Sequence, residues 1–271
     1  MDSYEKYILS GDWHLTDGSS TENITSNEDL MEFLFYVRDH RDYTLILMGD
    51  ILDLWQCDVE SIYREHQEIL DTLMEIAEED RLIYLRGNHD EEIDTEIHKI
   101  GFDMDPWIYD SYTLDYRGRS IFIHHGNVYD IFNHGKLSWI GKYVTKVAGV
   151  FEKLIDSKFE ERMWDYIYRI KRHIYPSPEN YSGNNYEFLQ RAIDDLKEYD
   201  CVIYGHTHDA GMYYIDRAIK QIQSEVTRSG ESINIVPGSV VNTGAWIFGR
   251  EDIYVIEDEK ITMWDFRDFP H

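Results

Sequence analysis

The chain has 271 residues and a formal net charge of −27, from 26 Lys and Arg against 53 Asp and Glu. This length suits one large α/β domain with a sizeable core, and no apolar run reaches the roughly 18 residues of a membrane span. The acidity excludes extensive nonspecific binding to nucleic acid, because phosphate contacts require Lys and Arg. Cys57 and Cys201 stand far apart beside apolar runs. We therefore expect free thiols, a reducing compartment and a cytoplasmic protein.

Apolar runs alternate with helical patterns over the first hundred residues. Helices are expected at 27–40, with Asn27 as the cap, and at 59–79, where apolar positions recur with a helical period. Short runs rich in β-branched and aromatic residues predict buried strands at 7–9, 43–48 and 81–85. This alternation is typical of a layered α/β fold.

Beyond residue 105 the pattern changes to strands and turns. Residues 116–119 predict a hairpin turn. Further strands are expected at 120–123, 201–204, 233–241, 252–256 and 261–266. Two sheets packed between layers of helices would account for this pattern.

The stretch 131–175 is long, aromatic and helix-like. It holds nine Lys or Arg against five Asp or Glu, so its charge is +4 within a strongly acidic chain. Such a segment can bind a substrate that joins an apolar group to a phosphate, or can rest on an anionic membrane surface. An ordinary pair of packed helices with a solvated basic face is an equally weighted alternative.

Five blocks rich in metal-binding side chains each follow an expected strand. The first three follow the strands at 7–9, 43–48 and 81–85, and the last two follow those at 120–123 and 201–204. The blocks are Asp12-Trp13-His14, Gly49-Asp50-Ile51-Leu52-Asp53, Gly87-Asn88-His89-Asp90, His124-His125-Gly126 and Gly205-His206-Thr207-His208. Ligands of α/β sheets bind outside the carboxyl ends of the strands, so the blocks are expected to converge on one crevice. Extended backbone would point residues i and i+2 to the same side. Carboxylate, amide and imidazole donors together favour Mn, with Fe or Zn as alternatives.

This ordered set resembles the calcineurin-like metallophosphoesterases, and the resemblance spans roughly residues 5 to 250. It implies a single metallophosphoesterase domain over 1–271, with the four-layer α-β-β-α sandwich of that family and an inserted helical cap at 131–175, with 198 as the outer bound. It implies two divalent ions. The ligands that match by position are Asp12, His14, Asp50 and His208 for one ion, and Asp50, Asn88, His125 and His206 for the other.

The resemblance also assigns roles around the ions. Asp50 would bridge them, and His89 would contact the phosphate and protonate the leaving oxygen, so the catalytic set is His89, Asp50 and Asn88. Asp53 would orient nearby groups. Alternation points His124 away from His125, so His124 is expected to be packed or hydrogen-bonded. Two ions lower the pKa of bound water and attract an anionic phosphoryl group.

The cap, the Gly205–His208 block and Asn242-Thr243-Gly244-Ala245-Trp246 are similar to the branch containing the UDP-2,3-diacylglucosamine pyrophosphatases. This similarity implies a phosphodiester or pyrophosphate substrate of the nucleotide-sugar lipid kind, a phosphorylated small-molecule or lipid-linked partner, and peripheral contact with a membrane. Further substrate contacts are expected at Asn127, Asp130, His134, Lys136 and Asn242. A phosphomonoesterase or nuclease, and a noncatalytic interaction scaffold of the same fold, remain as alternatives. A protein serine/threonine phosphatase is disfavoured because Leu54-Trp55 follows Asp53.

Overall fold

The computed structural model describes residues 6–18, 27–129, 183–246 and 250–270. Its first sheet has the strand order β10-β13-β12-β1-β2-β3-β4. The strands β1 to β4 run parallel to one another, and β12, β13 and β10 extend the sheet through antiparallel pairs. The bounds are β1 Lys6–Ser10, β2 Tyr43–Leu47, β3 Leu82–Leu85, β4 Ile108–Tyr109, β10 Ser232–Asn234, β12 Asp252–Glu257 and β13 Lys260–Asp265.

The second sheet has the order β5-β6-β7-β11-β8-β9. Its three central strands, β6, β7 and β11, are parallel, and antiparallel strands flank them on both sides. The bounds are β5 Ser111–Tyr116, β6 Arg119–His124, β7 Cys201–Tyr204, β8 Gly211–Asp216, β9 Gln221–Val226 and β11 Ser239–Asn242.

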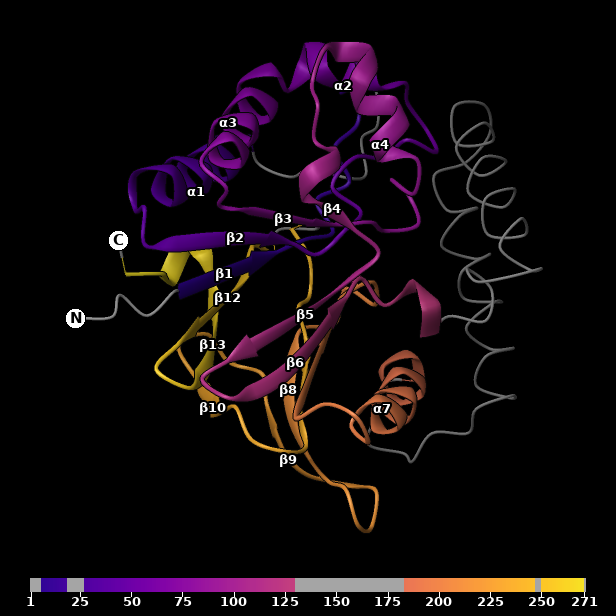
Figure 1. The fold of residues 1–271 in the computed structure, drawn as a ribbon, viewed down its shortest axis with the longest axis vertical. Coiled ribbons are helices and arrows are strands. Elements are labelled where there is room, and N and C mark those ends of the chain that lie inside the picture. Colours follow the sequence, from indigo (N-terminus) through magenta and orange to yellow (C-terminus); the bar gives the residue numbers. More distant parts are fainter. Residues whose placement is uncertain (1–5, 19–26, 130–182, 247–249, 271) are drawn as a thin grey trace.

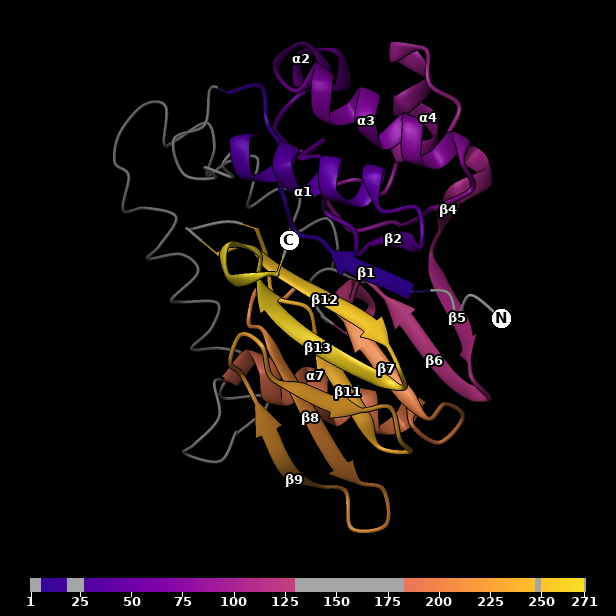
Figure 2. The ribbon, with the colours of Figure 1, turned by 90° about the vertical axis from the view of Figure 1, so that its left-hand side faces the viewer.

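Helices cover the outer face of each sheet, as the two views in Figure 1 and Figure 2 show. The first sheet carries α1 Asn27–Asp39, α2 Val59–Glu65, α3 Gln67–Glu78 and α4 Ile93–Glu96, and the second carries α7 Gly183–Asp195. Short 3-10 turns are η1 Ile97–Ile100, η2 Asp105–Trp107, η3 Asn127–Tyr129 and η5 Phe266–Asp268.

Among the described residues, three apolar cores separate the four layers. One core lies between α1 to α4 and the first sheet, one between the two sheets, and one between the second sheet and α7. Neighbouring residues of a strand enter different cores: Ile8 packs toward the helices, and Leu9 packs between the sheets. Because both faces of the central strands are buried, these strands appear in the sequence as continuous apolar runs. The expected α-β-β-α sandwich is confirmed.

The helix expected at 59–79 is broken at His66. Its backbone leaves the helical region with φ −119° and ψ 32°, which separates α2 from α3. The His66 ring contacts the Thr16 carbonyl through Nε2 at 2.8 Å. The apolar period continues through the break, so the sequence pattern alone did not reveal it.

The single strand expected at 233–241 is also wrong. Its beginning forms β10 at the edge of the first sheet, and its end forms β11 within the second sheet. Gly238 lies between them with φ +108°, where the chain crosses from one sheet to the other. The β8–β9 hairpin was not predicted. The turn expected at 116–119 is confirmed, with positive φ at both Arg117 and Gly118 as a tight hairpin requires.

Residues 183–195, within the outer bounds of the expected cap, form α7 and pack on the second sheet as the fourth layer. The cap at 131–175 lies outside the described residues, so its role stays a prediction. Both cysteines are free, as expected. Among the helices in the described ranges, none combines the length and apolar character needed to cross a membrane.

Candidate metal centre

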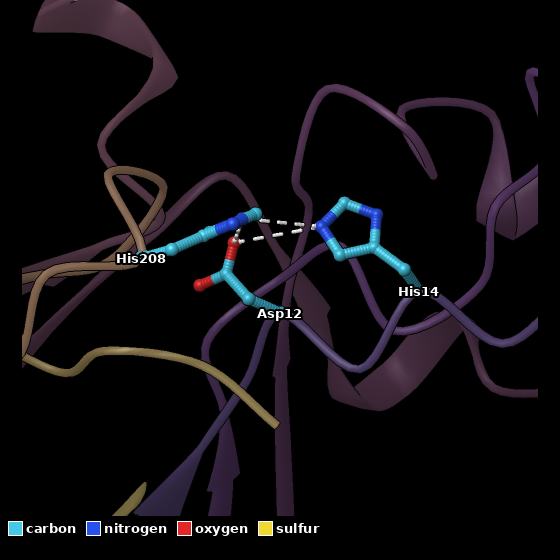
Figure 3. A group of neighbouring side chains, drawn as sticks. All are labelled: Asp12, His14 and His208. Atoms are coloured by element: carbon cyan, nitrogen blue, oxygen red, sulfur yellow. Dashed lines mark hydrogen bonds and ion pairs between the residues drawn. The ribbon is translucent and has the colours of Figure 1, made fainter. Parts of the chain in front are cut away.

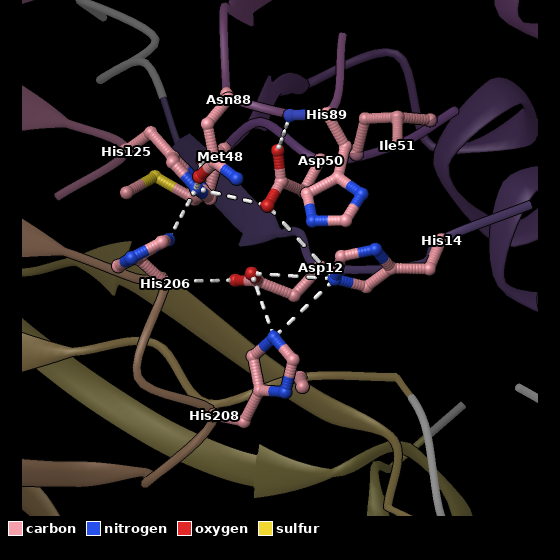
Figure 4. Close-up of polar contacts among 12 residues, drawn as sticks. Asp12, His14, Met48, Asp50, Ile51, Asn88, His89, His125, His206 and His208 are labelled. Atoms are coloured by element: carbon pink, nitrogen blue, oxygen red, sulfur yellow. Dashed lines mark hydrogen bonds and ion pairs between the residues drawn. The ribbon is translucent and has the colours of Figure 1, made fainter. Parts of the chain in front are cut away.

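The five sequence blocks occupy loops at the carboxyl ends of parallel strands. In chain order they carry Asp12 and His14 after β1, Asp50 after β2, Asn88 and His89 after β3, His125 after β6, and His206 and His208 after β7. The strands β1, β2 and β3 are parallel in one sheet, and β6 and β7 are parallel in the other. Figure 4 shows the side chains from both sheets meeting between these strand ends.

The first two loops run side by side in a fixed register. The backbone N–H of Asp12 donates to the Gly49 carbonyl, and that of His14 donates to the Asp50 carbonyl, each at 3.0 Å. The carboxylates of Asp12 and Asp50 therefore lie on two loops that are hydrogen-bonded to each other.

Five of the predicted ligands have left-handed backbone conformations. The angle φ lies between 47° and 69° at Asp12, His14, Asp50, His206 and His208. This region costs a non-glycine residue about 1 kcal/mol or more, and strain of this kind concentrates at functional sites. The extended backbone expected at Asp12 and His14 and at His206 and His208 is therefore wrong. Their side chains do converge, but through left-handed residues.

Two glycines allow the loops to approach one another. A Cβ atom on Gly87 would lie 2.1 Å from Asp50 Oδ1, and one on Gly49 would lie 2.8 Å from His125 Nδ1. Gly49 also has φ +88°. Side chains at these positions would displace Asp50 and His125, so glycine is required for the convergence.

A first group of donors comprises Asp12, His14 and His208 (Figure 3). The Nε2 atoms of the two imidazoles are 3.3 Å apart, and Asp12 Oδ1 lies 3.2 Å from His208 Nε2 and 3.9 Å from His14 Nε2. Asp12 Oδ2 accepts a hydrogen bond from the His206 N–H at 3.2 Å. Oδ1 is buried and accepts no hydrogen bond from the described residues, so it is available to a cation.

A second group comprises Asp50, His125 and His206, with Asn88 beside them. His125 Nε2 lies 3.1 Å from His206 Nδ1, 3.2 Å from Asp50 Oδ2 and 3.3 Å from Asn88 Oδ1. Asp50 Oδ2 also lies 3.9 Å from His14 Nε2 in the first group. One oxygen of Asp50 thus faces both groups, as Figure 4 shows.

These separations fit two divalent ions. Donors bound to one ion at about 2.0–2.2 Å lie roughly 3–4 Å from one another, which is the spacing found in both groups. Each group mixes carboxylate oxygen with imidazole nitrogen, a donor set that suits Mn, Fe or Zn. The contact between the Asp50 Oδ1 atom and the His89 N–H, at 2.7 Å, leaves Oδ2 as the shared donor.

Neighbouring groups orient the imidazole of His125. Its Nδ1–H donates to the Met48 carbonyl at 2.7 Å, which turns Nε2 toward the donor group. Burial disfavours the charged ring, but Asp50, Asp12 and the Met48 carbonyl together outweigh burial and raise the pKa of His125 to about 10. An imidazole must be neutral to bind a metal ion, so an ion bound here displaces this proton and metal affinity rises with pH.

The surroundings also shift the pKa values of His14 and Asp50. Burial and the nearby His89 lower the pKa of His14 to about 4, which keeps this imidazole neutral and able to bind a cation. Burial raises the pKa of the Asp50 carboxyl, but His125 and His89 outweigh burial and hold it well below its usual value. Asp50 is therefore an anion at neutral pH.

His89 lies beside the two groups and is held by Asp53. His89 Nδ1 is 3.0 Å from Asp53 Oδ1, and the His89 and His14 rings meet at a right angle with centroids 4.7 Å apart. Burial lowers the pKa of His89, but Asp50 and Asp53 outweigh it and raise the pKa above its usual value. Asp53 thus contacts a group beside the donors, and its orienting role stays a prediction.

Asp90 ends the third block and was not predicted to have a role. Its Oδ1 accepts from the Gly87 N–H at 2.7 Å, and its Oδ2 accepts from the Ile51 N–H at 2.8 Å and the Tyr84 hydroxyl at 2.6 Å. Asp90 thereby joins the second loop to the third. The acidic residue directly after Gly87-Asn88-His89 is the sequence feature that could have indicated this role.

The expected substrate contacts are only partly within the described residues. Asn127 is half-buried in η3, two residues after His125. Asn242 ends β11 and is fully buried, and its amide donates to the Thr207 hydroxyl within the fifth block. Their contact with substrate stays a prediction, and Asp130, His134 and Lys136 lie outside the described residues.

His124 points away from the donor groups, as expected. It is buried, its ring meets that of Tyr129 edge to face with centroids 4.6 Å apart, and burial lowers its pKa to about 3. His124 is therefore a packed, neutral residue.

Comparison with known families agrees with the fold. The model of the calcineurin-like phosphoesterases matches residues 6–210, which is most of the chain. The chain therefore belongs to the calcineurin-like phosphoesterases. This family binds divalent metal ions, and the two donor groups are the candidate ligands for them here. No curated protein sequence matches this chain.

Several solved structures are similar to this chain at low identity. A dimetal phosphatase from Danio rerio has 13% identity and a TM-score of 0.45, over 96% of this chain and 95% of that one. A metallophosphoesterase from Sphaerobacter thermophilus has 11% identity and a TM-score of 0.44, over 96% and 87%. A double mutant of Vps29 from Entamoeba histolytica has 14% identity and a TM-score of 0.41, over 95% and 89%. These similarities concern the fold alone.

Proposed function

We propose that the protein is a dinuclear metal-dependent hydrolase of phosphodiester or pyrophosphate bonds. The observation that carries the proposal is the position of Asp50 Oδ2, 3.9 Å from His14 Nε2 in one donor group and 3.2 Å from His125 Nε2 in the other. A carboxylate oxygen between two such groups can serve two cations, as a two-metal hydrolytic centre requires. Membership of the phosphoesterase family supports the same reaction class.

The residues would divide between two ions. Asp12, His14 and His208 would hold one, and Asn88, His125 and His206 would hold the other, with Asp50 shared. Two divalent ions at this spacing supply Lewis acidity to the phosphoryl oxygens and lower the pKa of water. We propose manganese, with iron or zinc as alternatives, because the donors mix oxygen with several imidazoles.

His89 is the proton donor in this proposal. Asp53 binds Nδ1, which leaves the other ring nitrogen free to face a bound phosphoester. The two anions Asp50 and Asp53 favour the protonated ring. A protonated imidazole in this position can transfer its proton to the departing oxygen.

For the substrate, we propose a nucleotide-sugar lipid similar to UDP-2,3-diacylglucosamine. The support is the similarity of the blocks to that branch and the +4 charge of the aromatic segment 131–175, which follows the His125 block directly in the chain. Basic and apolar side chains together suit a phosphate joined to acyl chains. The protein would then work in the cytoplasm with peripheral contact to a membrane.

Hydrolysis assays test this proposal. With Mn²⁺ present, we expect bis-p-nitrophenyl phosphate to be hydrolysed faster than p-nitrophenyl phosphate, and EDTA to abolish both reactions. Release of UMP from UDP-2,3-diacylglucosamine would support the lipid substrate. Faster hydrolysis of the monoester would favour a phosphomonoesterase, and cleavage of oligonucleotides alone would favour a nuclease. Two bound ions without hydrolysis of any substrate would favour an interaction scaffold.

A further inference from the structure

A short turn after the second block carries Trp55. The N–H groups of Gln56 and Cys57 donate to the Asp53 carbonyl at 3.2 and 3.1 Å and close the turn. The N–H of Asp53 donates to the Leu15 carbonyl at 2.9 Å, which ties the turn to the loop after β1. Trp55 is therefore presented by well-fixed backbone beside the candidate metal centre.

The indole of Trp55 stacks on the imidazole of His89. The ring centroids are 4.0 Å apart and the ring planes differ by 22°. Asp53 holds the same imidazole at its edge, through Nδ1 at 3.0 Å. The two contacts restrain different motions, because the hydrogen bond fixes the position of Nδ1 while the indole prevents the ring from tilting out of its plane.

Core packing does not account for Trp55. Trp13 and Trp246 are 0% and 1% exposed and belong to the core between the helices and the first sheet. Leu54, the neighbour of Trp55, also packs on that core. Trp55 itself is partly exposed and belongs to none of the three cores of the described chain. Its close contact with His89 is thus a separate feature of the turn.

We propose that Trp55 is a positioning residue that holds the His89 ring at the tilt needed to protonate the leaving oxygen. The inference rests on the proposed function of His89 as proton donor. The stacked indole restrains the ring through the geometry of the contact, with centroids 4.0 Å apart. The same 53–57 turn then supplies both restraints on His89, the carboxylate of Asp53 and the indole of Trp55.

Leaving-group dependence distinguishes positioning from a structural role. Nitrophenolate departs without a proton, whereas the more basic phenolate depends on an acid. We expect Trp55→Leu to slow the turnover (kcat) of diphenyl phosphate about 5- to 10-fold and that of bis-p-nitrophenyl phosphate less than about 2-fold. Trp55→Phe should restore part of the loss. Equal losses on both diesters would overturn the proposal.

A double-mutant cycle gives a second test. On a His89→Ala background, Trp55→Leu should have no further effect on diphenyl phosphate, because its partner is gone. Losses that multiply would mean that Trp55 acts independently of His89. Trp107→Leu is the matched control, since Trp107 is also half-buried but contacts Asp80 at 3.3 Å, and this variant should keep wild-type turnover.

A measurement without turnover separates this proposal from the proposed function. In the zinc-loaded protein, 13C relaxation at Cε1 of His89 should show a rigid ring in the wild type and a more mobile ring in Trp55→Leu. An unchanged ring would overturn the positioning role whatever the activity. If the wild type hydrolyses neither diester nor UDP-2,3-diacylglucosamine, the proposed function fails, and the mobility of the ring still decides whether Trp55 positions His89. Should Trp55→Leu fail to fold, Trp55→Phe serves in both measurements.

Discussion

Asp50→Ala is the sharpest test of the shared carboxylate. Asp12→Ala provides a matched control, because both residues are 0–1% exposed, both have φ 51° and both lose a carboxylate. Asp12 Oδ1 faces the imidazoles of the first donor group and Asp12 Oδ2 accepts from the backbone of His206, whereas Asp50 Oδ2 faces imidazoles of both groups. We therefore expect Asp50→Ala to lose both ions and Asp12→Ala to lose one.

The size of the effect follows from the contacts removed. Asp50→Ala removes the hydrogen bond from the His89 N–H at 2.7 Å, which as a bond to a charged group contributes about 1.5–3 kcal/mol. Alanine at positive φ adds about 1 kcal/mol of strain, equally in both variants. Replacing a residue that only hydrogen-bonds to a metal ligand already lowers metal affinity about 10- to 100-fold. Loss of a charged direct ligand should exceed the upper end of that range for each ion it serves.

Metal analysis after gel filtration in metal-free buffer provides the measurement. The expected stoichiometries are two ions for the wild type, one for Asp12→Ala and none for Asp50→Ala, with hydrolysis abolished in the last. Retention of two ions by Asp50→Ala would refute the bridging role, and loss of both by Asp12→Ala would refute the division into two groups. If either alanine variant does not fold, asparagine at the same position tolerates positive φ and tests the same charge.

Four further outcomes are expected. His89→Ala should keep both ions and slow phosphoester hydrolysis about 10²- to 10⁴-fold, and unchanged turnover would remove His89 from the reaction. Burial raises the pKa of Glu251 to about 7 from 4.5, so the folded state holds the proton more tightly and the free energy of unfolding falls as pH rises from 4.5 to 7. Glu251→Gln should therefore stabilise the protein at pH 8, by at most about 3 kcal/mol in urea unfolding, and have almost no effect at pH 4.5; an equal effect at both pH values would contradict this explanation. Because the net charge is −27, Tm should rise with added NaCl, and a fall in Tm would show that self-repulsion is not the dominant charge effect. Neutralising the basic residues of 131–175 should impair a lipid-bearing substrate more than bis-p-nitrophenyl phosphate, and equal losses would leave the segment a structural role.

The candidate site could be predicted from the sequence because its parts are local. Each block is a few residues long and follows an apolar run, so the strand and the donors after it are visible together. Parallel strands bring their carboxyl ends to one edge, which is why Asp50 and Asn88 could be expected near Asp12. The predicted orientation of the His124–His125 pair also depended only on the alternation of a strand.

Other features depend on contacts between distant segments. The break at His66 coincides with a contact to Thr16, fifty residues earlier. The assignment of β10 and β11 to different sheets depends on their partners β13 and β7, which the run 233–241 does not specify. The role of Asp90 likewise required Ile51 and Tyr84 to be brought to its carboxylate.

The sequence by itself determined the strands that precede the five blocks, the side chains available as ligands and the family of the fold. Only the tertiary structure decided that Asp50 directs one oxygen to both donor groups and that Trp55 stacks on His89. The physical reason is that a pattern of hydrophobicity specifies which face of an element is buried but not which groups it meets there. These side-chain contacts arise from the close approach of loops at Gly49 and Gly87, the left-handed backbone of the predicted ligands and the packing of the two sheets against each other.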